Sequence, residues 1–198
     1  MMEHYRLDKL VANLIDRKKT KIVLNKRIES FPEGFDKIIG CDGAHSQMRK
    51  LLKIKDSNCR IGIQGFINKE DFSEFVEVWP TKKGFIWKIP RGRKVEYGII
   101  ENSEKAKILF DRFLGERNIR LENFVSGFIP QGFKIPFNNR ITLCGDAAGL
   151  TKPWSGGGVI WGLIAANLLL KNFPKPDIFL ILRIARTKGN PLTVDKLA

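Results

Sequence analysis

The chain has 198 residues, 43% hydrophobic and 28% charged, a composition that excludes a low-complexity chain and allows a sizeable core. Its formal net charge of +14 favours anionic partners such as lipid headgroups or polyphosphate ligands, although a solvated lysine-rich surface gives the same count. The three cysteines, Cys41, Cys59 and Cys144, form no CxxC pair, so neither a disulfide framework nor a metal site is predicted. Cys41 and Cys144 each end an apolar run and are expected to be buried, in a reducing compartment.

The first sixty residues predict a helix, a strand and a strand-to-helix corner. The segment LDKLVANLIDRKK has apolar residues at helical spacing, and KIVLNKRIESF predicts a strand and a turn. DKIIGCDGAHSQMRKLL then predicts a short apolar strand that passes through Gly and Asp into a helix. The opening residues MMEHYRLDKL lack the apolar core of a signal peptide, so we expect a cytoplasmic protein with membrane contact only at its surface.

From about Arg60, alternating apolar residues predict a β-rich segment, with strands in IGIQGFIN, FVEVWP, GFIWKIP and VEYGII. The turn PRGRK joins the last two as a hairpin. SEKAKILFDRFLGERN predicts an amphipathic helix capped by Ser103. Its expected inward face consists of Ala106, Leu109, Phe110, Phe113 and Leu114. We therefore expect a mostly antiparallel sheet module here.

After Gly127 the pattern returns to strand and helix. RITLCGDAAG predicts an apolar strand that ends at Gly-Asp, and SGGGVIWGLIAANLLLKN predicts a helix that Ser155 caps. This helix is apolar nearly all round and is therefore expected to be buried.

Two strand-to-helix corners are the candidate ligand-binding segments. In each of them, IIGCDGAHS and TLCGDAAG, a predicted strand stops at an Asp beside a Gly. Ligands of open α/β sheets bind outside the carboxyl ends of strands, although Asp-Gly is also a common turn. The second corner continues into PWSGGG, where glycines expose backbone N–H groups at a positively polarised helix start. Pro153 would fix the approach of this loop. A tightly packed helix start without a ligand is the structural alternative.

These motifs resemble those of a known group of flavoproteins. CDGAHSQMR resembles the Asp-Gly motif of flavoprotein hydroxylases, and GDAAG followed by P-x-x-G-G-G resembles their second FAD motif. The spacing from Asp146 to Gly158 is similar to that of the geranylgeranyl reductase family, as are GFIWKIP, FIPQG and HYRLDKLV. The resemblance runs from about Tyr5 to Asn172. It implies an α/β (α+β) fold in which an FAD-binding Rossmann-like layer is interleaved with an antiparallel β-sheet substrate module.

The resemblance also implies domain boundaries: residues 1–59 and 129–173 would form the FAD-binding domain, 60–128 the substrate module and 174–198 a tail.

The resemblance further implies which residues contact FAD. Asp146 would contact the ribityl and pyrophosphate part, and the backbone N–H groups of Gly158 and Val159 would face the pyrimidine edge of the flavin. Asp42 and Gly43 would support the pyrophosphate side. The remaining cofactor-binding candidates are Arg6, the backbone at Ile28, Gly145, Gly156 and Gly157.

The function implied is an FAD-dependent reduction of isoprenoid (geranylgeranyl) double bonds in lipids, in which reduced flavin delivers hydride to an alkene. Trp79, Phe85 and Trp87 would line an apolar substrate channel, although aromatic residues on a sheet are also ordinary core. The basic surface would suit an anionic membrane, and the electron donor is open between NAD(P)H and a ferredoxin-like protein. No catalytic residue is assigned.

Other functions stay open at this point. One is an FAD-dependent aromatic hydroxylase, which shares both FAD motifs, although GFIWKIP argues against it. Another is a non-catalytic module that binds a lipid or a partner chain. Nucleic-acid binding is not predicted, because no recognition motif accompanies the charge.

The 198 residues contain no G-x-G-x-x-G segment, which the family uses near its N-terminus to cradle the FAD pyrophosphate. Three explanations are a truncated product, a fragment that pairs with a separately encoded piece, and a domain repurposed without FAD. We expect the isolated chain to bind FAD weakly or not at all, because losing the cradle costs a few kcal/mol and each 1.4 kcal/mol is roughly tenfold in affinity.

Overall fold

The computed structural model describes residues 4–55, 58–136, 138, 140–152 and 155–172. Pro153 and the predicted tail at 174–198 lie outside the described residues. The chain divides into two compact units, residues 1–30 and residues 31–198.

The smaller unit contains helix α1, His4–Asn13. It ends earlier than predicted, because Leu14 donates its N–H to Val11 and closes a tighter turn. The apolar side of α1 is exposed in the structure, with Leu10 at 51%. The strand expected after it is not present, and residues 21–30 form neither helix nor strand. Within this unit no described strand offers that segment the hydrogen-bonding partner a strand requires.

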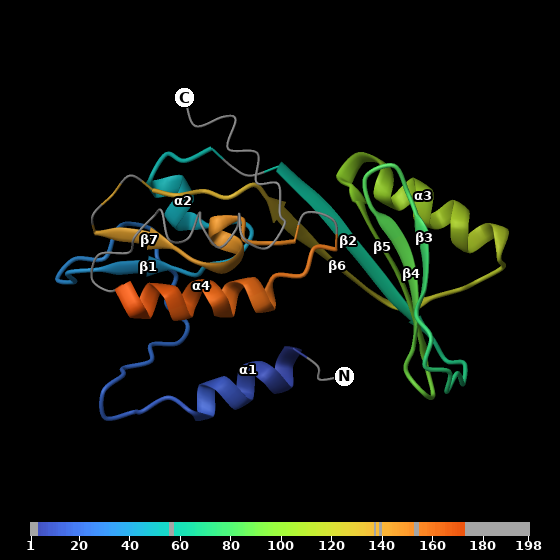
Figure 1. Ribbon diagram of the computed structural model, residues 1–198, viewed down its shortest axis with the longest axis horizontal. Helices are drawn as coiled ribbons and strands as arrows, with labels where there is room; N and C mark the ends of the chain where they lie inside the picture. The colour runs from blue at the N-terminus through green and yellow to red at the C-terminus, as the bar shows by residue number, and fades with distance from the viewer. Residues whose placement is uncertain (1–3, 56–57, 137, 139, 153–154, 173–198) are drawn as a thin grey trace. The chain divides into compact units, whose positions relative to one another are not determined.

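The larger unit has an α/β layer built on two short parallel strands. Strands β1 and β7 pair from Ile38↔Ile141 to Gly40↔Leu143, so the strands that lead into the two Asp-Gly corners lie in one sheet, as predicted (Figure 1). The elements of this layer are β1 (Ile38–Gly40), α2 (Gln47–Leu51), β7 (Ile141–Leu143), the 3-10 turn η1 (Gly145–Ala148) and α4 (Val159–Asn172).

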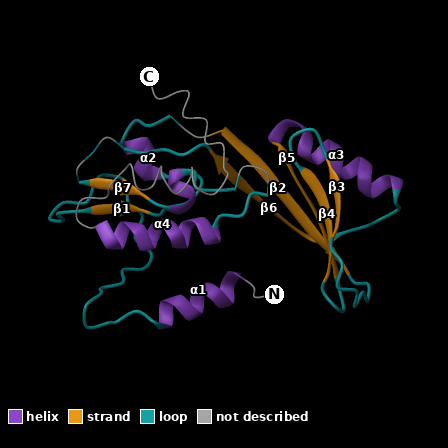
Figure 2. Cartoon of the chain, in the orientation of Figure 1, coloured by secondary structure: helices purple, strands orange, loops and turns teal. Residues whose placement is uncertain are grey.

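An antiparallel sheet of five strands is inserted between the halves of this layer, with the order β3-β4-β5-β2-β6 (Figure 2). Its strands are β2 (Asn58–Ile67), β3 (Glu77–Pro80), β4 (Phe85–Pro90), β5 (Val95–Asn102) and β6 (Glu122–Gln131). The hairpin β4–β5 was predicted. β6 was not, because Ser, Gly and Pro interrupt its apolar alternation. A parallel layer interleaved with an antiparallel sheet is the predicted fold class.

Helix α3, Ser103–Glu116, covers one face of the antiparallel sheet. The predicted inward face is confirmed: four of its members are buried and Leu109 packs against them. The cap is different from the prediction, because Asn102 occupies the N-cap position and Ser103 is the first helical residue. The buried core between helix and sheet consists of Ile86, Ile99, Ala106, Phe110, Phe113 and Leu114.

Helix α4 differs from the prediction in its start and in its burial. It begins at Val159, so Ser155 lies in the turn before it and is not its N-cap. Ala165 and Leu169 are buried, whereas Leu163 is 62% exposed. One side of α4 packs on η1, and the described elements of its unit do not enclose the other sides. No helix among the described residues is long and apolar enough to cross a membrane.

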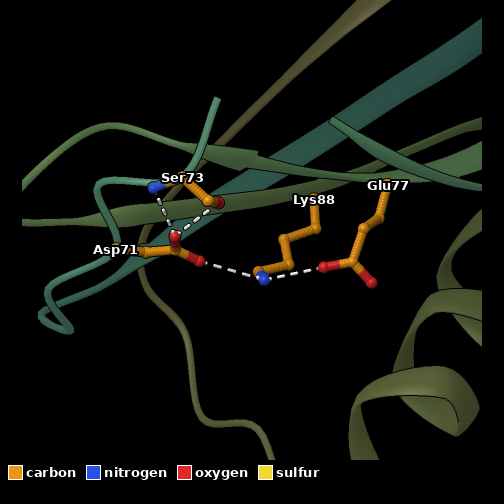
Figure 3. A network of polar contacts seen from close by, with 4 residues as sticks. All are labelled: Asp71, Ser73, Glu77 and Lys88. Carbon is orange, nitrogen blue, oxygen red and sulfur yellow. Dashed lines mark hydrogen bonds and ion pairs between the residues drawn. The ribbon is translucent and has the colours of Figure 1, made fainter. Parts of the chain in front are cut away.

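A polar network ties the edge of the antiparallel sheet together (Figure 3). Lys88 Nζ lies 3.0 Å from Asp71 Oδ2 and 2.7 Å from Glu77 Oε1. Hydrogen bonds from Ser73 and Lys88 lower the pKa of Asp71 to about 2. The two carboxylates in turn raise the pKa of Lys88. The network holds the loop before β3 against β4.

Candidate cofactor-binding site

The first corner lies between β1 and α2. Asp42 Oδ2 accepts a hydrogen bond from the N–H of Met48 at 3.0 Å, and Ser46 Oγ accepts one from the N–H of Arg49 at 3.0 Å. Burial opposes ionisation of Asp42, but hydrogen bonds from the Ser46 hydroxyl and the Met48 N–H prevail and hold its pKa below the ordinary value. Ser46 is thus the N-cap of α2, and Asp42 accepts a second N–H of its first turn. Gly43 follows Asp42 in a left-handed conformation with φ of +79°.

A buried arginine joins the two corners. Arg49 is 1% exposed, and its Nη1 donates to the carbonyl oxygen of Ala147 at 2.8 Å and to that of Asp146 at 3.4 Å. Its Nη2 donates to the carbonyl oxygen of Ala44 in the first corner. Because the guanidinium is a rigid planar fork, these bonds fix one corner relative to the other. Sequence reasoning gave Arg49 no role; its place inside the Asp-Gly motif was the available signal.

The second corner is the turn η1 with its flanking glycines. Gly145 and Gly149 have φ of +61° and +69°, and Gly149 donates its N–H to the carbonyl oxygen of Asp146 at 2.9 Å. Ala147 and Ala148 are fully buried at 0% exposure. The left-handed glycines allow a sharp reversal of the chain, and the buried alanines anchor it. The backbone of Asp146 is therefore held in place by the buried alanines that follow it.

Asp146 and the glycine loop, which we define as residues 155–158, come together at the start of α4. A methyl group placed on Gly158 would lie 2.9 Å from Asp146 Oδ1, so Gly158 leaves the carboxylate space that a side chain would take. Asp146 is half-buried, and burial raises the pKa of its carboxyl above the ordinary value. The first N–H groups of α4, which begins at Val159, have no partner within the helix. The structure thus brings together the three residues expected nearest the flavin.

The glycines before α4 differ in what they require. Gly156 has φ of +71°, and a methyl group on it would lie 2.5 Å from Ile100 Cδ1 and 3.2 Å from Ile129 Cδ1. A side chain there would press on the tips of both isoleucines and would also be strained by the left-handed backbone. A methyl group on Gly157 would make only an ordinary contact, at 3.7 Å from Lys152 Cδ. Gly157 therefore has room for an alanine side chain, and Gly157→Ala is a matched control for the effect of Gly158→Ala on stability.

The glycine loop packs on the face of the antiparallel sheet opposite α3. Ile100, which meets this loop, pairs in register with Phe85, and Gly98 pairs with Trp87. Directly paired residues of neighbouring strands point to the same face. The Trp87 ring covers Gly98, since a methyl group there would lie 2.2 Å from Trp87 Cζ2. Two of the aromatic substrate candidates, Phe85 and Trp87, thus lie on the same face of the sheet as the glycine loop. We call this surface, formed by Phe85, Trp87 and Ile100, the open face.

Trp79 lies on the other face. It pairs with Ile86, a member of the core under α3, and its ring centroid lies 4.8 Å from that of Phe113. The Arg117 guanidinium stands 5.6 Å from the Trp79 ring. The structure therefore does not bring Trp79 together with the two aromatics of the open face.

Arg6 and Ile28 belong to the smaller compact unit, residues 1–30. Arg6 lies in α1, and Ile28 lies in the segment without helix or strand. Their assignment to the outer part of the cofactor stays a prediction.

Two cysteines directly follow the paired strands. Cys144 is 8% exposed, as expected, and its N–H donates to the carbonyl oxygen of Gly40 at 2.9 Å. Cys41 is exposed, so the prediction that it is buried is wrong. A methyl group on Gly40 would face Met48 and Leu143, and because successive residues of a strand alternate in direction, Cys41 points away from that core.

The chain is similar to curated archaeal proteins, while no family model matches it. It is 28% identical over 218 residues to the digeranylgeranylglycerophospholipid reductase of Methanococcus vannielii, with 87% of this chain and 55% of that protein covered. The reductase of the same name from Methanococcus aeolicus is 26% identical, with 77% and 44% covered. An uncharacterized protein from Methanocaldococcus jannaschii is 29% identical, with 75% and 40% covered. The chain thus spans about half the length of these relatives.

Solved structures share the fold. A geranylgeranyl bacteriochlorophyll reductase-like protein from Thermoplasma acidophilum superposes with a TM-score of 0.56 at 18% identity, over 79% of this chain and 43% of that one. A tryptophan halogenase from Shewanella frigidimarina superposes with a TM-score of 0.54 at 17% identity, over 77% and 32%.

The fold is therefore that of the Rossmann-type reductases and halogenases. Within that class, the resemblance to the geranylgeranyl reductase family is confirmed by the curated relatives and the structural neighbour together. The two methanococcal relatives are named as reductases.

Proposed function

We propose that the two corners and the glycine loop bind FAD and that the chain serves an FAD-dependent reduction of isoprenoid double bonds in lipids. One observation carries the proposal: Asp146 meets a glycine at the start of α4 whose missing side chain leaves a cradle. Bound FAD would supply hydride-transfer chemistry.

The residues present fit such a cofactor. Asp146 is half-buried with a raised pKa, so its ionised carboxylate gains most from new hydrogen-bond donors such as sugar hydroxyls. Gly158 admits a flat ring close to the backbone. The N–H groups that open α4, with the helix dipole behind them, would stabilise negative charge on that ring. The open face beside the loop supplies an apolar wall, with Phe85 and Trp87 ring centroids 5.8 Å apart.

The substrate class in the proposal comes from the relatives. The two methanococcal proteins are named as reductases of a geranylgeranyl phospholipid, and a net charge of +14 suits an anionic lipid surface. The aromatic hydroxylase interpretation has no better support from the comparisons. An isoprenoid lipid is thus the proposed substrate, at a membrane surface, with NAD(P)H or a ferredoxin-like protein as candidate electron donors.

The test separates cofactor binding from turnover. FAD binding is first measured by equilibrium dialysis. Because the isolated chain is expected to bind FAD weakly, the protein is then incubated without oxygen with excess FAD, dithionite as reductant, and vesicles of a glycerophospholipid that carries geranylgeranyl chains. Mass spectrometry then follows the lipid. We expect the lipid to gain two hydrogen atoms per reduced double bond, less in Asp146→Ala, and the same amount in the control Gly115→Ala in α3, where an added methyl group meets nothing within 4 Å.

Two other results would change the account. Binding of FAD without a mass gain in the lipid would overturn the substrate class and keep the cofactor site. Binding of the vesicles with no response to FAD would favour a non-catalytic lipid-binding module.

A further inference from the structure

We propose that Cys41 and Cys144 are a dithiol–disulfide pair, a redox-modification site that links the ends of β1 and β7. The proposed oxidant is a small-molecule disulfide such as oxidised glutathione. The proposal does not depend on FAD binding or on any lipid substrate.

The backbone places the two cysteines one residue beyond the last rung of a parallel ladder. The last registered pair is Gly40↔Leu143, and the N–H of Cys144 donates to the carbonyl oxygen of Gly40 at 2.9 Å. Cys41 and Cys144 are the next residues of their strands. Neighbouring strands lie roughly 4.8 Å apart, which falls within the Cα separation of about 4.4–6.8 Å that disulfides span. No large backbone movement is therefore needed to join them.

The side chains already interact. The two thiols lie close enough for a hydrogen bond between them to shift both pKa values. It lowers the pKa of Cys144 to about 7 and, together with burial and the nearby Asp42 carboxylate, raises that of Cys41. Such a pair loses its first proton as a unit. One thiolate is therefore available near neutral pH, which is the species that attacks disulfides.

The two sulfur atoms differ in their exposure to solvent. Cys41 is exposed and Cys144 is buried. An incoming disulfide reaches the Cys41 sulfur, which becomes the attacking thiolate when its proton passes to the neighbouring Cys144 thiolate. The Cys144 sulfur itself is held out of solvent. This is the arrangement of an exposed thiol with a resolving partner.

The reaction balances without any further reagent. One protein thiolate attacks a sulfur of the small disulfide, forms a mixed disulfide and releases one small thiolate. The second protein thiol gives up its proton and attacks the mixed disulfide, so that the Cys41–Cys144 bond forms and a second small thiolate leaves. The protein loses two electrons and two protons, and the oxidant becomes two thiols. Excess small thiol reverses both steps.

The bond would act on the cofactor corners directly. Cys41 precedes Asp42, and Cys144 precedes Gly145 and Asp146. Oxidation would thus cross-link the two loops that Arg49 now joins only by hydrogen bonds. The redox state of the pair would set the rigidity of this edge of the sheet.

The test uses the whole chain in buffers of reduced and oxidised glutathione. Free thiols are trapped with N-ethylmaleimide, counted by intact mass and mapped by peptide mass spectrometry. We expect Cys41 and Cys144 to disappear together as one cross-linked peptide, with no glutathione retained and with Cys59 still trapped. The matched control Cys59→Ser should behave identically. Cys144→Ser and Cys144→Ala should retain glutathione on Cys41.

A second measurement guards against a bond that forms only in unfolded chains. The same equilibrium is measured in urea, where the fold no longer holds the two sulfurs together, and the ratio of disulfide to dithiol should drop at least tenfold. The proposal is overturned by stable mixed disulfides on both cysteines, by cross-links to Cys59 or between chains, or by an equilibrium that urea leaves unchanged.

Discussion

Replacing Gly158 with alanine tests the contact at the centre of the site. The new methyl group would lie 2.9 Å from Asp146 Oδ1, closer than such atoms approach, so the carboxylate or the helix start must move. Overpacking of this kind costs about 1–3 kcal/mol. Gly157→Ala meets only an ordinary contact, at 3.7 Å, and both variants share the roughly 0.4–1 kcal/mol gained from a stiffer unfolded chain. The difference between the two variants therefore isolates the overpacking.

The assay is thermal unfolding of both variants and of each combined with Asp146→Ala. For a chain of this size about 1 kcal/mol shifts the melting temperature by roughly 2–4 °C, so Gly158→Ala should melt about 2–12 °C below Gly157→Ala. With Asp146→Ala the clash partner is gone, and the cost of Gly158→Ala should shrink by about 0.5–3 kcal/mol. Equal costs in both backgrounds would refute the contact and with it the cradle.

Three further predictions follow from individual side chains. Arg49→Met removes charged hydrogen bonds to carbonyl groups of both corners and should cost about 2–4 kcal/mol in urea unfolding; an unchanged midpoint would contradict its role. Burial raises the pKa of Asp146 above 3.8, so the wild type should lose stability relative to Asp146→Asn as pH rises past that value; pH-dependent melting checks this, and parallel curves would count against it. Lys88→Met removes two ion pairs and should lower the urea midpoint at neutral pH. Because the pKa of Asp71 is lowered to about 2, that effect should fade as pH drops from 3.8 towards 2, and an effect independent of acid would be the contrary outcome.

Local pattern was enough to predict the elements that decide the fold. Alternation in GFIWKIP and VEYGII predicts the β4–β5 hairpin, and the apolar spacing of α3 predicts its buried face. The spacing of the second FAD-like motif also predicted that Asp146 and Gly158 lie close to each other in one site. These features depend on residues close in sequence, or on a motif with a fixed internal spacing.

What the sequence could not predict depends on distant partners. Arg49 acts through carbonyl groups about a hundred residues away, and nothing in its own segment specifies them. Trp79 and Trp87 both lie in predicted β-strands, and the sequence does not indicate which face of the sheet each occupies. Strand pairing places Trp79 against the α3 core and Trp87 on the open face. The prediction that Cys41 is buried was wrong for a related reason. The apolar run before it suggested burial, but side chains alternate in direction after Gly40, so Cys41 points away from the core of Met48 and Leu143.

The most direct test of the cofactor site is a titration of the isotope-labelled chain with FAD, followed by the chemical shifts of its backbone amides, because this method detects weak binding as well as strong. The account predicts saturable shifts concentrated at residues 145–149 and at Gly158 and Val159. Those shifts should be much reduced in Asp146→Ala and kept in the control Gly115→Ala, whose added methyl group in α3 meets nothing within 4 Å. Shifts spread over the basic surface, or identical shifts in Asp146→Ala, would contradict the proposal that this corner holds FAD.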